Sequence, residues 1–121
     1  MTKRKVLIVD DEYDLSEVTS FRLEIQGYDV QRAYNGYEGV EMAKTFQPDL
    51  ILMDVLMPVM NGYEASKMLK QDEATRNIPV IAFTAANETL IGRKTIQRSD
   101  DVILKPYNIE DLVSKINNLI Q

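Results

Sequence analysis

Residues 49–62 read DLILMDVLMPVMNG, and the other elements of the chain can be placed outward from them. The apolar run Leu50–Met53 has the length of a strand buried on both faces of a parallel sheet, although periodicity alone also allows a helix. Asp54 follows where this run ends, and Pro58 and Gly62 mark a turn before the next helix. Ligands of open α/β sheets bind beyond the carboxyl ends of the strands. Asp54 therefore either caps a turn or belongs to a functional site.

On both sides of this stretch, short apolar runs alternate with helical patterns. The expected strands are Lys5–Val9, Tyr28–Tyr34, Leu50–Met53, Pro79–Phe83 and Val102–Leu104. The expected helices are Tyr13–Gln26, Tyr37–Phe46, Tyr63–Gln71, Asn87–Gln97 and a last one from Ile109 almost to Gln121. Five alternations predict one α/β domain over residues 1–121, with a parallel sheet and helices on both faces. The polar second strand is expected near an edge of the sheet.

Helical spacing predicts which side chains face the core. In the first helix we expect an inward stripe of Leu15, Val18, Phe21 and Ile25. In the third helix we expect Met68 and Leu69 to face inward. The last helix has the cleanest stripe, which consists of Ile109, Leu112, Val113, Ile116, Leu119 and Ile120.

Composition excludes several kinds of site. The 121 residues are 45% hydrophobic, which suits one globular domain. Fourteen basic and nineteen acidic residues give a net charge of −5, and no basic run suggests direct binding to nucleic acid or an anionic membrane. The absence of cysteine and histidine excludes disulfides, thiolate metal sites and imidazole chemistry. The apolar run Val6–Val9 is too short for a signal peptide or a membrane span, so a cytoplasmic protein is expected.

Four expected strands end in polar side chains, which are Asp10 and Asp11, Asp54, Thr84 and Lys105. In a parallel sheet these strand ends lie along one edge. Clustered carboxylates raise each other's pKa unless a cation neutralises them, and oxygen ligands without cysteine or histidine favour Mg²⁺. A carboxylate can also attack phosphorus, while a metal, an ammonium and a hydroxyl stabilise the transferring phosphoryl group.

Each of these residues also has an ordinary structural interpretation. Asp10 and Asp11 suit the first turn of a helix, Thr84 suits a strand, and Lys105 suits a solvated loop. Their arrival at successive strand ends favours a common site. Met57 and Met60 are interpreted as packing residues rather than ligands.

Over nearly its whole length, the chain resembles the receiver domain of two-component response regulators, which has the CheY-like fold. The shared motifs are the acidic pair after the first strand, Asp54-x-x-Met57-Pro58-x-Met60-Asn61-Gly62, Thr84-Ala85 and Lys105-Pro106. The resemblance implies a five-stranded parallel sheet in the order 2-1-3-4-5, with Mg²⁺ as the cofactor.

The resemblance also implies a role for each site residue. Asp54 would be the phosphoacceptor, which receives a phosphoryl group from a histidine of a sensor kinase or a phosphotransfer protein. Lys105 would pair with the phosphoryl group, and Thr84 would move toward it and transmit the signal. The Lys105–Pro106 peptide would be cis. The Mg²⁺ ligands would be Asp11, Asp54 and the backbone carbonyl of Leu56, with Asp10 acting through water.

Two departures from the family pattern concern signal output rather than chemistry. Val102 stands where many members have an aromatic residue that moves with the threonine. Arg98-Ser99 replaces the usual Gly-Ala ahead of Asp100-Asp101. The face formed by the fourth helix, the fifth strand and the last helix is therefore expected to switch differently.

Three other functions compete with a phosphorylatable receiver. A binding module that works without phosphorylation would usually have lost an acidic residue or the lysine. A haloacid-dehalogenase phosphatase needs a second aspartate at Leu56, and a nucleotide or flavin site needs a glycine-rich loop where Asp10-Asp11-Glu12 stand. The interpretation is a switch rather than an enzyme, either a stand-alone regulator or a phosphorelay shuttle, monomeric with dimerisation on phosphorylation.

Overall fold

The computed structural model describes residues 3–55, 57–85, 93–94, 97 and 99–120, the side chain of Thr84 excepted. Its strands are β1 (Lys5–Val9), β2 (Asp29–Ala33), β3 (Leu50–Met53), β4 (Val80–Thr84) and β5 (Asp101–Leu104). Its helices are α1 (Tyr13–Ile25), α2 (Gly36–Phe46), α3 (Gly62–Gln71) and α5 (Ile109–Ile120). The helix expected at Asn87–Gln97 falls largely outside the described residues.

All strand pairs are parallel, and the sheet has the order β2-β1-β3-β4-β5. This confirms the predicted fold class. The central strands β1 and β3 are continuous apolar runs because both of their faces are covered, and the four residues of β3 are fully buried. The polar strand β2 forms an edge of the sheet, as predicted. Among the described residues, no helix is long and apolar enough to cross a membrane.

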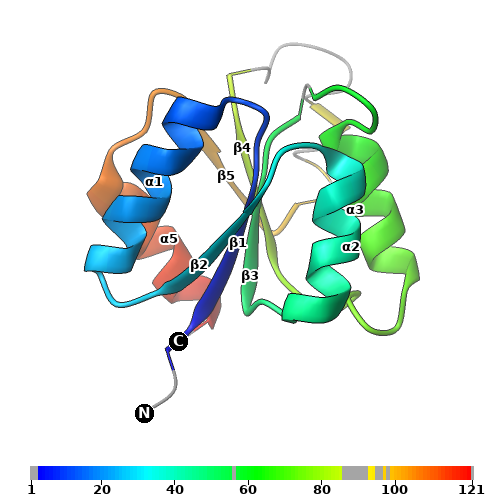
Figure 1. Ribbon diagram of the computed structural model, residues 1–121, viewed down its shortest axis with the longest axis horizontal. Helices are drawn as coiled ribbons and strands as arrows, with labels where there is room; N and C mark the ends of the chain where they lie inside the picture. Colours follow the sequence, from blue (N-terminus) through cyan, green and yellow to red (C-terminus); the bar gives the residue numbers. More distant parts are fainter. Residues whose placement is uncertain (1–2, 56, 86–92, 95–96, 98, 121) are drawn as a thin grey trace.

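Two hydrophobic clusters hold the helices to the sheet, with α1 and α5 on one face and α2 and α3 on the other (Figure 1). The last helix buries Leu112 and Ile116 completely, and the rest of its predicted stripe packs against the first cluster. Met57 and Met60 pack against the second cluster, which confirms their interpretation as packing residues.

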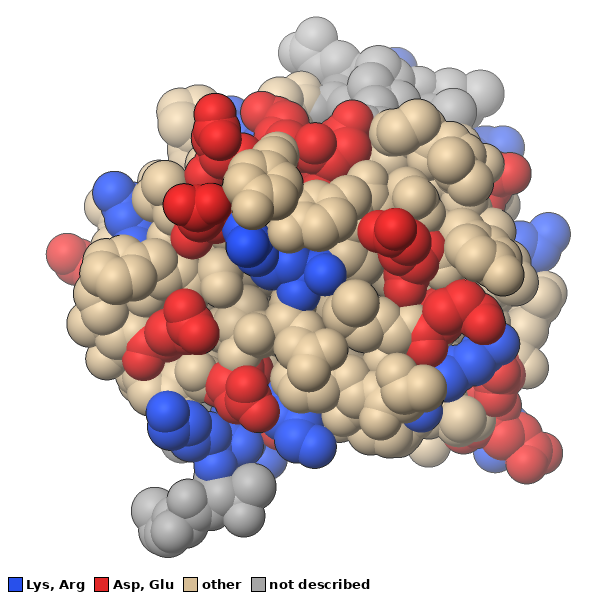
Figure 2. Space-filling model, in the orientation of Figure 1, with Lys and Arg blue, Asp and Glu red and all other residues tan. Residues whose placement is uncertain are grey.

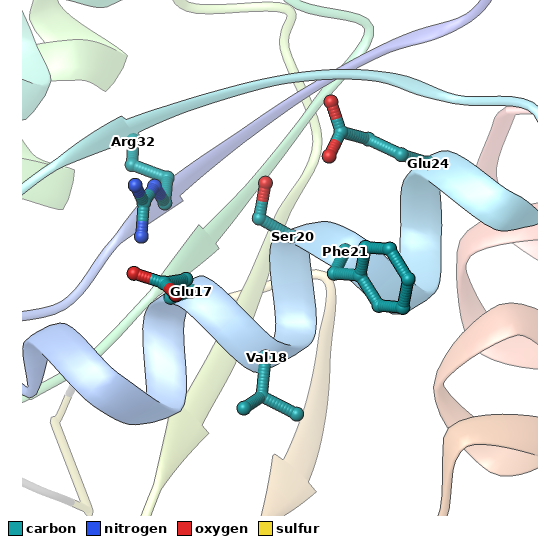
Figure 3. Close-up of a pocket in the computed structure, with 6 residues that line it drawn as sticks. All are labelled: Glu17, Val18, Ser20, Phe21, Glu24 and Arg32. Atoms are coloured by element: carbon teal, nitrogen blue, oxygen red, sulfur yellow. The ribbon is translucent and has the colours of Figure 1, made fainter.

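The predicted inward stripe of α1 is confirmed at Leu15, which packs against the first cluster, and is wrong at its other three residues. Val18, Phe21 and Ile25 are 46%, 63% and 66% exposed. The buried residues of this helix are Ser16, Thr19, Ser20 and Leu23. Small side chains let α1 approach the sheet closely, and in Figure 3 Ser20 points toward β2 whereas Val18 points away from it. Met68 of α3 is also exposed, contrary to prediction, while Leu69 is buried.

This correction predicts a contrast between two neighbouring positions of α1. Leu23→Ala is expected to lower the free energy of unfolding by about 3 kcal/mol, because it leaves a cavity in the core. Phe21→Ala is expected to change it by only about 0.5 kcal/mol, because this ring lies at the surface. Urea unfolding of both variants measures the difference. Equal losses would show that Phe21 is buried in solution.

Candidate functional site

The carboxyl ends of three strands bring an ammonium and two carboxylates together. Asp10 and Asp54 follow β1 and β3, which are neighbours in the sheet and pair Val9 with Met53. Lys105 follows β5, and its Nζ lies 2.8 Å from Oδ2 of Asp10 and 3.4 Å from Oδ2 of Asp54. Acidic side chains gather at this upper edge of the molecule in Figure 2. The predicted convergence of Asp10, Asp54 and Lys105 is therefore present.

Burial and backbone hydrogen bonds fix the two carboxylates. The side chains of Asp10, Asp54 and Lys105 are only 0%, 8% and 10% exposed. The Val55 N–H donates to Oδ1 of Asp54 at 2.8 Å, and the Glu12 N–H donates to Oδ1 of Asp10 at 2.9 Å. One oxygen of each carboxylate is thus bound to backbone, and the other faces the ammonium.

Glu12 completes the group, although it was not among the site residues predicted from the sequence. Its Oε1 lies 2.7 Å from the Nζ of Lys105. Glu12 is the N-cap residue of α1, but its side chain makes no capping hydrogen bond in the described part of the chain and turns to the lysine instead. Its place directly after the Asp10-Asp11 pair is a signal that points to it.

The electrostatics of the site are dominated by negative charge. Burial, and then the charge of Asp10, raise the pKa of Asp54 to about 6, against the opposing effects of Lys105 and the Val55 N–H. Burial alone would lower the pKa of Lys105. Hydrogen bonds to Asp10 and Glu12 and the charges of Asp54 and Asp10 outweigh that effect, so this pKa is raised. The site at neutral pH contains one cation and an excess of carboxylate.

This donor set fits a divalent cation. Ligand oxygens of Asp10, Glu12 and Asp54 lie within 4.8 Å of one another, and a single ammonium leaves their charge unbalanced. Oδ2 of buried Asp10 has the Lys105 ammonium 2.8 Å away, and the same ammonium is shared with Glu12 and Asp54. Carboxylate oxygens of this kind suit Mg²⁺.

Two of the expected metal ligands, Asp11 and the carbonyl of Leu56, are not among the described members of this group. Asp11 is exposed and does not belong to the carboxylate group that the described residues form. Leu56, whose carbonyl was expected to bind the metal, lies outside the described residues. Both assignments stay predictions.

The loop between Asp54 and α3 is tightly closed. The Gly62 N–H donates to the carbonyl of Val55 at 2.7 Å, and Asn61 and Glu64 form a reciprocal capping box at the start of α3. A γ-turn runs from Pro58 to Met60, with a 2.7 Å hydrogen bond and Val59 at its centre at φ 68°. These contacts fix the backbone on both sides of the loop.

The remaining predicted residues lie in β4 and β5 or directly after β5. Thr84 pairs with Leu104 at the end of β4, and Val102 is half-buried in β5 opposite Ala82. The Lys105–Pro106 peptide is cis, as the resemblance implied. The Nζ of Lys105 also lies 5.0 Å from the ring centroid of Phe83, a cation–π contact that the sequence analysis did not identify.

Comparison with known proteins agrees with this geometry. The DNA-binding dual master transcriptional regulator RpaA of Synechocystis sp. is 35% identical over 118 residues, which are 97% of this chain and 49% of that protein. The chain spans about half the length of the curated relatives it matches.

Two solved structures share the fold over 98% of this chain, both at 28% identity. One is the receiver domain of the sensor histidine kinase PA1611 of Pseudomonas aeruginosa, with a magnesium ion coordinated in its active-site cleft (TM-score 0.91, 98% of that chain). The other is the chemotaxis protein CheY4 of Vibrio cholerae (TM-score 0.88, 99% of that chain). The family model of the response regulator receiver domain matches residues 6–117. The chain therefore belongs to the receiver-domain family of two-component response regulators.

Proposed function

We propose that this receiver domain accepts a phosphoryl group on Asp54 from a phosphohistidine of a partner protein, either a sensor kinase or a phosphotransfer protein. The observation that carries the proposal is the position of Oδ2 of Asp54, buried and 3.4 Å from the ammonium of Lys105. A carboxylate so placed has a cation beside it for the oxygens of the incoming phosphoryl group.

The transfer uses the two oxygens of Asp54 differently. Oδ1 is held by the Val55 N–H, which leaves Oδ2 as the nucleophile. An electron pair of Oδ2 forms the new bond to phosphorus, the P–N bond of the donor breaks, and its electron pair returns to the imidazole nitrogen. The product is an acyl phosphate. With its pKa at about 6, Asp54 is mostly ionised at pH 7 and is a competent nucleophile.

Mg²⁺ is the proposed cofactor. Asp10 and Asp54 would hold the ion with their buried carboxylates, and the resemblance adds Asp11 and the carbonyl of Leu56. When bound, the ion neutralises charge that develops on the phosphoryl oxygens. The magnesium ion in the receiver domain from P. aeruginosa supports this choice of metal.

The domain is proposed to act as a cytoplasmic switch rather than as an enzyme with a substrate of its own. Phosphorylation of Asp54 would be read out through Thr84 and β5, where Val102 replaces the usual aromatic residue. The side chain of Val102 has no ring to rotate. The output would therefore depend on a different movement of β5 and α5.

Phosphorylation by a small donor tests the proposal. Incubated with acetyl phosphate and Mg²⁺, the protein is expected to gain one phosphoryl group in its intact mass. Asp54→Asn is expected to gain none, because an amide is a poor nucleophile. Asp29→Asn, which removes an exposed carboxylate at the amino end of β2, is the matched control and is expected to behave like the wild type.

Three outcomes would count against the proposal. No mass gain in the wild type would favour a binding module that works without phosphorylation. Continuous hydrolysis of acetyl phosphate would favour a phosphatase. An undiminished mass gain in Asp54→Asn would place the phosphoryl group on another residue.

A further inference from the structure

We propose that Glu12 is a positioning residue that competes with the phosphoryl group for Lys105. This inference rests on the proposed function, because it concerns how readily Asp54 becomes phosphorylated. In this competition Glu12 holds the ammonium in the unphosphorylated protein and must release it for phosphoryl transfer.

The distances show where Lys105 is held. Its Nζ lies 2.7 Å from Glu12 and 2.8 Å from Asp10, but 3.4 Å from the phosphoacceptor Asp54. The two shorter contacts draw the ammonium toward the β1 side of the site. Lys105 therefore lies closer to Asp10 and Glu12 than to Asp54.

An ammonium has three N–H donors, and the site offers it three carboxylates, those of Asp10, Glu12 and Asp54. A phosphoryl group on Asp54 brings new oxygens that need a donor. Asp10 is fully buried, so its carboxylate could not exchange the ammonium for water. The side chain of Glu12 is 58% exposed, so water can replace the lysine there. Glu12 is thus the carboxylate that releases Lys105 when Asp54 is phosphorylated.

The backbone of Glu12 is fixed while its side chain is free to yield. Its N–H donates to Oδ1 of Asp10 at 2.9 Å, and its carbonyl accepts the Ser16 N–H at 2.9 Å in the first turn of α1. The residue therefore stays beside the site whether or not its carboxylate contacts Lys105. This arrangement favours a reversible contact rather than a rearrangement of the helix.

A double-mutant cycle with Glu12→Gln and Lys105→Met tests the competition. The measured quantity is the rate of phosphorylation by acetyl phosphate at saturating Mg²⁺. Glu12→Gln is expected to raise this rate roughly three- to fivefold, the factor for an ion pair with a partly exposed partner. In the Lys105→Met background the same change is expected to alter the rate by less than about twofold, because there is no ammonium to release.

Glu12→Asp separates the contact from the charge. The shorter side chain keeps its negative charge but reaches the ammonium less well, so it is expected to accelerate phosphorylation as Glu12→Gln does. If Glu12→Asp instead matches the wild type while Glu12→Gln is faster, charge repulsion explains the effect and the competition is refuted. If Glu12→Gln is phosphorylated more slowly and binds Mg²⁺ at least about tenfold more weakly by calorimetry, Glu12 is a metal ligand. This outcome would also refute the competition for Lys105.

Urea unfolding in EDTA gives a second readout that needs no phosphoryl group. With Lys105 present, Glu12→Gln is expected to lower the unfolding midpoint, because an ion pair is lost. In Lys105→Met it is expected to raise the midpoint, because it relieves repulsion among three carboxylates. A role of Glu12 only in the start of α1 would shift both midpoints in the same direction, which would refute the inference.

Failure of the inference and failure of the proposed function are distinguishable. If the wild type gains no phosphoryl group, the proposed function fails, whatever the urea midpoints show. If the wild type is phosphorylated and Glu12→Gln is no faster, the proposed function stands and the competition for Lys105 is refuted.

Discussion

Gly62→Ala is expected to lower the free energy of unfolding by about 3 kcal/mol, which is a large effect for one methyl group. A Cβ atom at Gly62 would lie 2.0 Å from the carbonyl oxygen of Asp54 and 3.0 Å from Cα of Val55. Both atoms belong to backbone that continues the buried strand β3, so neither can move aside cheaply. The loop would have to open at Asp54 itself.

The expected loss of stability in Gly62→Ala comes from a steric clash rather than from an unfavourable backbone conformation. Gly62 begins α3, and it is not among the described residues with positive φ. Its N–H bonds the carbonyl of Val55 at 2.7 Å, a contact that brings the start of α3 against the end of β3. Gly36 is used in the same way, since a Cβ there would lie 2.3 Å from the carbonyl oxygen of Met60. At Gly36 and Gly62 the chain thus packs directly against backbone atoms of Met60 and Asp54, with no room for a side chain.

Urea unfolding of Gly62→Ala measures this effect. Lys67→Ala is the control, because Lys67 is an exposed residue of the same helix, where alanine is well tolerated. The folded fraction of Gly62→Ala is also expected to be phosphorylated more slowly by acetyl phosphate, because the displaced carbonyl belongs to Asp54. Equal midpoints for Gly62→Ala and Lys67→Ala would show that the loop has room that the structure does not reveal.

The sequence predicts the central strands well because their short apolar runs, bounded by polar residues and turn signals, have the length of buried strands. Val6–Val9 and Leu50–Met53 are unbroken apolar runs, and only a position with both faces covered suits them. The order of the strands came from the resemblance rather than from periodicity. The face of α1 could not be predicted because its buried residues include Ser16, Thr19 and Ser20 beside Leu23, and apolarity does not mark these three. Thr19 is accommodated there by a 2.5 Å hydrogen bond to the hydroxyl of Tyr107.

The site, like the fold, is predictable from the sequence only in part. The sequence predicts that Asp54 and Lys105 meet, because parallel strands end at one edge. It does not distinguish among three consecutive acidic residues at the end of β1. The carboxylates of Asp10 and Glu12 both reach the Nζ of Lys105, at 2.8 Å and 2.7 Å. Asp10 and Glu12 therefore share the site, while Asp11 is exposed between them.

The excess negative charge of this site predicts that Asp54→Asn stabilises the metal-free protein. At pH 7.5 in EDTA, the variant is expected to have a free energy of unfolding about 2 kcal/mol higher than that of the wild type. The substitution keeps the shape of the side chain and removes a carboxylate whose charge is disfavoured by burial and by Asp10. Its carbonyl oxygen can still accept the Val55 N–H, so the backbone contact is retained.

The pH dependence follows from the sign of the pKa shift. In the folded protein, burial and then Asp10 raise the pKa of Asp54 to about 6, above the value of about 4 for an aspartate in an unfolded chain. Between these two values the folded state binds more protons than the unfolded state. The contribution of Asp54 to stability is therefore full below about pH 4 and is lost as the pH rises through about 6.

The difference in the free energy of unfolding between Asp54→Asn and the wild type is thus expected to be near zero at pH 4. It is expected to reach its full value by about pH 7. Urea unfolding of both proteins across this range in EDTA measures it. Saturating Mg²⁺ at pH 7.5 is expected to abolish the advantage of the variant, because the cation stabilises the ionised carboxylate of the wild type. A difference that is independent of pH, or that favours the wild type at pH 7.5 in EDTA, would mean that Lys105 alone neutralises the site. In that case the charge argument for a divalent cation would fail.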